Sequence, residues 1–424
     1  MEMSSGYKQT EVGVIAADWD VRRLGELGSV VRGGSPRPAG DPRYFNGDYI
    51  PWLTVAALTN VPEHQLFISE TVGFLTEEGS KHSRTLTDGT LIIANSGATL
   101  GVAKILSVTC CANDGIAAIT DLRNSDKQFL CHFINSKTKK LREDIATGNG
   151  QPNLNTGLIR GIVVPFPSLS EQTAIAEALS DVDALLSSLD ALIAKKRDIK
   201  QAAMQQLLTG KTRLPGFEGE WAVTRLGDHA TLIRNGVYSR AELSIDGSVK
   251  YLHYGDIHTS GAVHLNPSEA IMPFLDADKA VRLGRLVSGD VVFVDATEDL
   301  AGVGKSVEVV GAEGTEVVAG LHTIAVRFDK RILADGFKAY LQFIPAFGAH
   351  LRSLAAGTKV LSTNRSHITS AVIALPSIAE QAAIAQVLSD MDAELAALEA
   401  RRDKTRLLKQ GMMQELLTGK TRLV

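Results

Sequence analysis

Two segments of the chain carry apolar residues at alternating spacings of four and three, which is the pattern of a helix with one narrow apolar face. In the first segment these positions are Ile175, Leu179, Val182, Leu186, Leu189 and Ile193. In the second segment they are Ile384, Leu388, Met391, Leu395 and Leu398. Because a face this narrow is typical of paired helices, we predict two long helices that pack on each other as a coiled coil.

Both segments carry matching signals at their ends. Each begins with a proline followed by Ser-x-x-Glu, at Ser168 and Ser377, which predicts a capping box at the helix start. Each ends in Leu-Leu-Thr-Gly-Lys-Thr-Arg, with the glycine at Gly210 and Gly419, where a helix-terminating glycine and cationic residues are favoured. A helix of roughly forty residues would be about 60 Å long.

The two segments are copies of each other. Residues 167–214 and 376–423 align without a gap and are identical at more than half of their positions. A shorter echo precedes each copy, at residues 19–25 and 221–227, whereas the residues between these anchors barely resemble each other. A duplication of this kind determines the architecture. If the copies are related by a pseudo-two-fold axis, the two helices run antiparallel and each insert sits at its own end of the pair.

The inserts alternate short β-rich runs with glycine-containing turns, and each has a helical stretch near its end, at residues 129–145 and 336–355. We therefore predict an α+β fold with two variable α+β domains separated by an antiparallel coiled coil. The predicted boundaries are 1–166 and 215–375 for the variable domains, 167–214 for the central conserved helix and 376–424 for the distal one. A chain of 424 residues is long enough for several such domains.

Composition limits the function classes. The chain is 44% hydrophobic and 22% charged, has a polar start and lacks any run of 18 apolar residues, so we expect a cytoplasmic protein without membrane contact. The three cysteines, Cys110, Cys111 and Cys131, are too few for a disulfide framework, and we expect reduced, half-buried thiols. A net charge of −4 argues against coating nucleic acid by bulk charge, so if DNA is the partner, its basic contacts are local or supplied by another subunit.

Motifs of catalysis and metal binding are incomplete. Residues 301–306 resemble the end of a phosphate-binding loop, but Asp299 stands where that motif needs its first glycine. His253, Asp256 and His258 lack the spacing and the third ligand of a metal site. A nucleophile elbow, a dinucleotide fingerprint and the Asn-Pro-Pro-aromatic tetrad of adenine methyltransferases are also missing from the sequence. We predict neither catalytic nor metal-binding residues.

Two variable domains, each followed by a nearly identical helix, resemble the specificity subunit of a type I restriction-modification enzyme. The resemblance covers essentially the whole chain. It is carried by residues 167–172 with 376–381, by 207–214 with 416–423, and by the segments that begin at Trp19 and Trp221. Residues 148–155 also resemble that family's loop before the conserved helix, whereas the equivalent residues 357–364 depart from it.

The resemblance implies a division of labour. Each variable domain would recognise one half of a split site in double-stranded DNA, and the helices would set the gap, so that four residues inserted near 207–211 lengthen the recognised spacer. The conserved regions would bind two methyltransferase subunits, and we place this contact at Glu171, Gln172, Glu380 and Gln381. S-adenosylmethionine, ATP and magnesium would belong to the methyltransferase and restriction subunits. The chain itself would bind no cofactor and would not be catalytic.

DNA contacts need basic, amide or aromatic side chains on exposed turns. In the first domain the candidates are Arg32, Ser35, Arg37, Lys81, Arg84, Gln151, Asn153 and Asn155. In the second domain they are Arg234, Tyr238, Arg240, Lys359, Asn364 and Arg365. For any single residue, a solvated turn side chain is an equally good interpretation. The pairs Arg32/Arg37 and Arg234/Arg240, which occupy equivalent turns, are better supported.

Two other function classes stay open. A stand-alone DNA methyltransferase or nuclease would transfer methyl groups or cut DNA without partners. A scaffold whose variable domains bind proteins would not retard DNA in a gel even with a methyltransferase partner present.

Overall fold

The computed structural model describes residues 6–71, 73–146, 152–300, 302–357 and 360–424. The chain forms two compact units: unit 1 comprises residues 1–193 and 398–424, and unit 2 comprises residues 194–397. The two predicted helices are confirmed as α7 (Leu169–Leu207) and α12 (Ile378–Leu416), and each contributes residues to both units. None of the described helices combines the length and apolarity that a membrane crossing requires.

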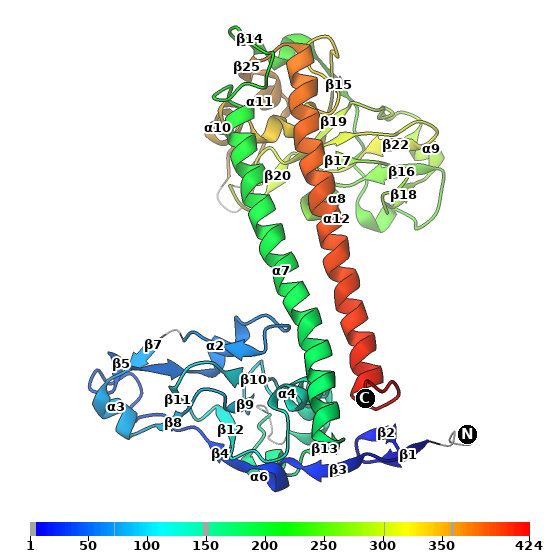
Figure 1. Ribbon diagram of the computed structural model, residues 1–424. Helices are drawn as coiled ribbons and strands as arrows, with labels where there is room; N and C mark the ends of the chain where they lie inside the picture. Colours follow the sequence, from blue (N-terminus) through cyan, green and yellow to red (C-terminus); the bar gives the residue numbers. More distant parts are fainter. Residues whose placement is uncertain (1–5, 72, 147–151, 301, 358–359) are drawn as a thin grey trace. The chain divides into compact units, whose positions relative to one another are not determined.

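The main sheet of unit 1 has five strands (Figure 1). In order across the sheet they are β4 (Ser29–Arg32), β12 (Ile116–Thr120), β9 (Leu91–Ala94), β10 (Ala103–Leu106) and β6 (Phe67–Ile68). A second sheet has the strands β7 (Gly73–Leu75), β5 (Phe45–Leu53), β11 (Cys110–Ala112) and β8 (Arg84–Leu86). Neighbouring strands are antiparallel except for the parallel pairs β10–β6 and β11–β5.

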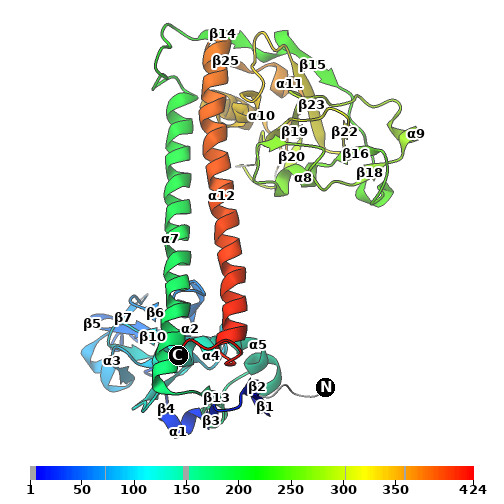
Figure 2. The ribbon, with the colours of Figure 1, turned by 45° about the vertical axis from the view of Figure 1, so that its right-hand side comes forward.

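Unit 2 repeats this strand order (Figure 2). Its five-stranded sheet consists of β15 (Ala230–Ile233), β23 (Thr323–Phe328), β19 (Val291–Val294), β21 (Ser306–Val309) and β17 (His264–Leu265). A smaller sheet consists of β18 (Phe274–Leu275), β16 (Val249–Leu252) and β22 (Glu316–Ala319). The parallel pairs, β17–β21 and β16–β22, fall at the same places as in unit 1. The two inserts therefore share one topology although their sequences have diverged.

Short elements complete each unit. In unit 1 they are β1 (Tyr7–Thr10), β2 (Gly13–Ala16), β3 (Asp20–Arg23), α1 (Leu24–Leu27), α2 (Val55–Thr59), α3 (Glu77–Lys81), α4 (Lys127–Ser136), α5 (Thr138–Lys140), the π-helix η1 (Leu141–Ile145), α6 (Thr156–Arg160) and β13 (Val163–Phe166). In unit 2 they are β14 (Ala222–Arg225), η2 (Leu226–His229), η3 (Arg240–Glu242), α8 (Tyr254–Thr259), α9 (Ala277–Ala280), β20 (Ala296–Thr297), η4 (Lys338–Phe343), α10 (Pro345–Leu354), β24 (Leu361–Ser362), α11 (Arg365–Thr369) and β25 (Val372–Leu375). The helical stretches expected near the end of each insert are confirmed.

In both units an amide side chain fastens a helix to the main sheet. Asn135 of α4 accepts from the backbone N–H of Ala103 at 2.8 Å and donates to its carbonyl at 3.1 Å. Gln342 of η4 makes the same two hydrogen bonds with Ser306, at 3.3 and 2.8 Å. Because a paired amide satisfies both backbone groups of one strand residue, it fixes the helix at one place along the sheet.

Within each unit the long helices run antiparallel. In unit 1 Lys409 Nζ lies 2.6 Å from Asp183 Oδ1, and Arg402 pairs with Asp190 further along both helices. In unit 2 Lys200 pairs with Asp392, the repeat equivalents of Lys409 and Asp183, and Lys196 Nζ lies 2.7 Å from Glu394. In both cases the residue numbers rise on one helix as they fall on the other.

The capping box forms only in part. The hydroxyls of Ser168 and Ser377 accept from the backbone N–H of Glu171 and Glu380, at 3.3 Å in both cases. The glutamate side chains do not reach back as the motif predicts. Glu171 accepts from Trp19 Nε1 at 3.0 Å and from Arg422, whereas Glu380 accepts from Arg213. The reason is that both carboxylates are buried against an arginine, a stronger donor than a backbone amide.

The helices end slightly earlier than their glycines suggest. α7 ends at Leu207 and α12 at Leu416, and one further turn of chain leads to Gly210 and Gly419, which have positive φ values of 68° and 70°. A Cβ on Gly419 would lie 2.9 Å from the Trp19 ring. These glycines are therefore required both by the left-handed backbone and by the lack of space.

The three cysteines are fully buried and free. The expectation of half-buried thiols was therefore wrong, because β11 and α4 lie inside the core of unit 1. Burial raises the pKa of Cys110 and Cys131 to about 12. These side chains act as small apolar residues.

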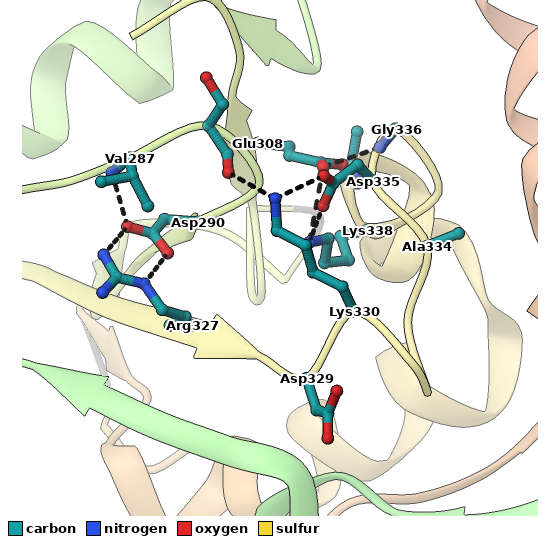
Figure 3. Close-up of polar contacts among 12 residues, drawn as sticks. Val287, Asp290, Glu308, Arg327, Asp329, Lys330, Ala334, Asp335, Gly336 and Lys338 are labelled. Carbon is teal, nitrogen blue, oxygen red and sulfur yellow. Dashed lines mark hydrogen bonds and ion pairs between the residues drawn. The ribbon is translucent and has the colours of Figure 1, made fainter. Parts of the chain in front are cut away.

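An ionic cluster with two buried members, Glu308 and Lys338, joins β21 of unit 2 to the start of η4 (Figure 3). The Glu308 carboxylate accepts from the backbone N–H groups of Gly336 and Ala339 at 2.7 and 2.8 Å. Lys338 Nζ lies 2.6 Å from Asp335 Oδ1 and 3.9 Å from Glu308 Oε1. Burial raises the pKa of Glu308 to about 7, in spite of the hydrogen bonds that favour its charged form.

Candidate nucleic-acid interface

The basic turn that follows β4 lies at one edge of the main sheet of unit 1. Gly33 N donates to Ile116 O at 2.8 Å and Gly34 N donates to Ala112 O at 2.9 Å, so the turn passes directly over the β11–β12 connection. A Cβ on Gly33 would lie 2.1 Å from the carbonyl oxygen of Asn113. Only glycine permits this approach, which brings the flanking basic side chains next to the β11–β12 turn.

Asp114, in that β11–β12 turn, contacts three of the predicted DNA-binding residues. Arg32 Nε donates to Asp114 O at 2.6 Å, and Ser35 Oγ donates to Asp114 Oδ1 at 2.8 Å. One Arg37 guanidinium nitrogen lies 3.5 Å from Asp114 Oδ2. Sequence reasoning missed Asp114, because an aspartate in a turn carries no sign that it meets residues roughly 80 positions earlier.

The opposite side of the turn is fixed by the start of β8. Arg84 Nε donates to Arg32 O at 2.7 Å, and Ser83 Oγ donates to Gly34 O at 2.7 Å. The structure therefore brings Arg84 to the turn, as a member of the same surface. Lys81 instead forms ion pairs within α3, with Glu78 at 3.2 Å and Glu77 at 3.7 Å.

The third predicted cluster of unit 1 lies at the same edge. Asn153 forms a β-bridge with Ser96, and Leu154 N donates to Asn95 O at 2.8 Å. Asn95 Nδ2 in turn donates to Asp114 O at 3.2 Å. Asn155 caps α6, because its Oδ1 accepts from Leu158 N at 2.9 Å. Gln151 lies outside the described residues.

We call this surface the loop edge of unit 1 and define it as residues 32–37, 83–84, 95–96, 114 and 153–155. It unites five separate segments of the chain. Of the predicted residues, it contains Arg32, Ser35, Arg37, Arg84, Asn153 and Asn155.

Unit 2 has an equivalent surface. Asn235, after β15, donates to Gly320 O at 3.2 Å and accepts from an Arg365 guanidinium nitrogen at 2.8 Å. Thr363 N donates to Asp295 O at 2.7 Å, which matches the bond between Leu154 and Asn95 in unit 1. Asn364 caps α11 as Asn155 caps α6. Although the two loops differ in sequence, they hold their helix caps in the same way.

We call residues 234–240, 295, 320–322 and 363–365 the loop edge of unit 2. Asn235, Asp295, Asn364 and Arg365 line an open pocket of about 470 Å³ at this edge. Lys359 lies outside the described residues.

The remaining candidates of unit 2 lie on the far part of the turn. Arg240 pairs with Asp256 of α8, and Lys279 Nζ lies 5.2 Å from the centre of the Tyr238 ring. Among the residues that the structure describes, Arg234 has no ion-pair partner. Of the two arginines in this turn, Arg240 already has a carboxylate partner, whereas the guanidinium of Arg234 can form a new ion pair with a bound ligand.

His253 and His258, which the sequence offered as an incomplete metal site, lie next to the loop edge of unit 2. His253 Nδ1 accepts from Gly255 N at 3.2 Å and caps α8, and His258 Nε2 lies 3.1 Å from Ala296 O. His322, which has a positive φ of 57°, places Nδ1 3.2 Å from Asp295 Oδ1 and lies edge-on to Tyr254. Across the described ranges, these side chains do not converge into a metal-binding group.

The four side chains assigned to partner binding are buried. Gln172 accepts from Asp126 N at 2.9 Å, and Gln381 accepts from Ala334 N at 2.9 Å. Glu171 and Glu380 are engaged by arginines, as described above. A direct contact with a partner would require these bonds to open, and the assignment stays a prediction.

Residues 16–196 match the family model of the type I restriction modification DNA specificity domain. The N-terminal part of the chain therefore contains a domain of this class. The specificity subunit of the type I restriction enzyme MjaIX from Methanocaldococcus jannaschii is 30% identical over 185 residues, which is 43% of this chain and 42% of that protein. The MjaVIII specificity subunit of the same organism is 22% identical over 428 residues, which covers 96% of this chain and 94% of that protein.

Two solved structures share the fold across the whole chain. The S subunit of a type I restriction-modification system from M. genitalium superposes with a TM-score of 0.59 at 12% identity and covers 98% of both chains. A chain from work on complex assembly of the type I R-M system gives a TM-score of 0.56 at 16% identity, and covers 96% of this chain and 99% of that one. Residues 16–196 therefore carry the domain that this family model describes, and over nearly its whole length the chain is similar to type I specificity subunits. The family resemblance noted in the sequence is thereby confirmed.

Proposed function

We propose that the chain is the DNA-recognition subunit of a type I restriction-modification system, and that each loop edge recognises one half of a split sequence. The observation that carries this proposal is the repeated strand order of units 1 and 2, with different side chains at equivalent edges. Where unit 1 presents Arg32, Arg37 and Asp114, unit 2 presents Arg234, Asn235 and Arg365. A shared scaffold with different contact residues suits two different half-sites.

The helices would form the frame between the two recognition domains. In this proposal residues 1–166 and 215–375 are target-recognition domains, and residues 167–214 and 376–424 form an antiparallel coiled coil. Equivalent ion pairs in the two units support this organisation. Each helix has 39 residues and would be about 58 Å long. That length exceeds the 34–36 Å, or about one DNA turn, between adjacent half-sites, so the helices can set the spacer.

Partner subunits would supply the chemistry. We infer that two methyltransferase subunits bind the conserved helices and carry S-adenosylmethionine, and that restriction subunits add an ATP- and magnesium-dependent motor. The chain itself would be non-catalytic and cytoplasmic. Because its net charge is −4, part of the phosphate neutralisation that DNA binding requires would come from the partners.

The proposal is tested with the chain in complex with a methyltransferase subunit of the same system. Selection from a random duplex library should yield two short conserved blocks with a fixed spacer, and the selected DNA should be methylated when S-adenosylmethionine is added. Methyl transfer by the chain alone would instead support the stand-alone enzyme. If the complex selects no sequence, the protein-binding scaffold is favoured.

A further inference from the structure

We propose that Asp114 is the positioning residue that gives the loop edge of unit 1 its base specificity. It would do so by holding Arg32 and Arg37 for contact with base edges and by opposing their use as general phosphate ligands. The inference rests on the proposed function and names the residue on which one half-site depends.

The contacts of the turn converge on this single residue, two of them on its carboxylate and the others on its backbone carbonyl. Three residues of one turn, Arg32, Ser35 and Arg37, contact Asp114 through its carbonyl and both carboxylate oxygens. Asn95 and Arg84 complete the support, the first by a bond to the Asp114 carbonyl and the second by a bond to the Arg32 carbonyl. A turn held from both sides presents its arginines in one orientation, which bidentate recognition of a base requires.

Stability does not explain the carboxylate. The side chains of Arg37 and Asp114 are 72% and 42% exposed, and ion pairs this exposed contribute little to folding. A carboxylate on a surface that faces DNA repels phosphate groups. It also offsets the charge of the adjacent Arg37 guanidinium, so the attraction between that guanidinium and a phosphate is weaker. A guanine edge can still accept two hydrogen bonds from the same guanidinium.

In unit 2 the carboxylate of Asp256 pairs with Arg240, whereas Arg365 is held by a neutral residue. Arg365 is held by the amide oxygen of Asn235 at 2.8 Å, and the carboxylate of Asp295 is directed to His322. Neutralisation of Asp114 should therefore affect only the half-site that unit 1 recognises, and the other half-site serves as an internal reference in the same experiment.

The test compares Asp114→Asn with Asp121→Asn in the complex with the methyltransferase subunit. Asp121 is exposed, lies at the opposite end of β12 and accepts a hydrogen bond from Thr120, so its substitution removes the same charge from the same unit away from the loop edge. Bound sequences are selected from a random duplex library. The dissociation constant for selected and unrelated DNA is then measured over a range of salt concentrations.

For Asp114→Asn we expect the preference for the selected bases at one half-site to fall about tenfold, which corresponds to the loss of part of one bidentate contact. Binding to unrelated DNA should tighten, and its log–log salt dependence should steepen by about 0.9, the value of one added phosphate contact. The other half-site and the spacer should stay unchanged. Asp121→Asn should match the wild type, and Asp114→Glu should restore discrimination in part because it restores the charge.

Three outcomes overturn the inference. The first is wild-type discrimination and salt dependence in a folded Asp114→Asn variant. The second is equal loss at both half-sites, which indicates a general structural role. The third is a clean change from one preferred base to another, which indicates that Asp114 itself contacts the base. If the wild-type complex selects no split sequence at all, the proposed function fails instead, so the two failures are distinguishable.

Discussion

Arg213 and Glu380 are 167 positions apart in the sequence and form a bidentate ion pair in unit 2, with N–O distances of 2.5 and 2.6 Å. In unit 1 Arg422 and Glu171, their repeat equivalents, pair in the same way. Each arginine ends one copy of the repeated helix segment, and each glutamate begins the other copy. The repeated motifs at the helix ends are thus complementary halves of one contact.

Replacement of Glu380 by alanine should destabilise unit 2 by about 3 kcal/mol, because it leaves a guanidinium in a half-buried site without its carboxylate. Urea unfolding monitored by circular dichroism measures the effect. Glu316→Ala removes the partner of Arg285 in an exposed pair of the same unit, and should change stability by less than about 1 kcal/mol. Equal effects of the two substitutions would show that burial of the ion pair is unimportant.

Substitution of alanine for Gly419 and for Gly411 should change the stability of the protein in opposite directions. Gly419→Ala places a methyl group against Trp19 in a left-handed backbone and should destabilise unit 1 by about 1–3 kcal/mol. Gly411 lies inside α12, where a Cβ meets nothing within 4 Å, so Gly411→Ala should stabilise by up to about 1 kcal/mol. Thermal unfolding of both variants checks the pair, and destabilisation by Gly411→Ala would contradict the open surroundings of that glycine.

The buried Glu308 should make unit 2 less stable as the pH rises. Its pKa is about 7 in the folded chain, above the ordinary value of 4.5, so the folded state binds the proton more tightly than the unfolded state. Stability from this group is fully present below pH 4.5 and is lost between pH 4.5 and about 7, by about 3 kcal/mol in total. Urea unfolding at pH 5 and pH 8 should therefore show a pH-dependent difference between the wild type and Glu308→Gln. A difference that is the same at both pH values would exclude this titration.

Arg37→Ala and Arg365→Ala should relax different half-sites. Each substitution removes one arginine from one loop edge and should lower discrimination at that half-site by about tenfold, while the other half-site keeps its preference. Arg331→Ala is the charge control, because Arg331 is paired with Asp329 and lies outside both loop edges. Library selection with the methyltransferase complex measures all three. Loss at both half-sites in one variant would contradict the assignment of one edge to each half.

The sequence by itself determined the elements and their duplication. The spacing of Leu179, Leu186 and Leu189 specifies a helix through side-chain periodicity alone, and the glycines at 210 and 419 mark its end through backbone conformation. These are local properties, and the structure confirms them. The resemblance to type I specificity subunits also follows from the sequence, because the motifs at both ends of the helix segments are repeated.

Only the tertiary structure decided which side chains meet. Glu171 satisfies the local rule for a capping box, yet it pairs with Arg422, since a buried carboxylate is stabilised more by a guanidinium than by a backbone amide. Asp114 gave no sequence signal and lies at the centre of the loop edge of unit 1. Contacts of this kind depend on how strands and turns distant in the chain are brought together, and that information is distributed over the whole core and not held in any short motif.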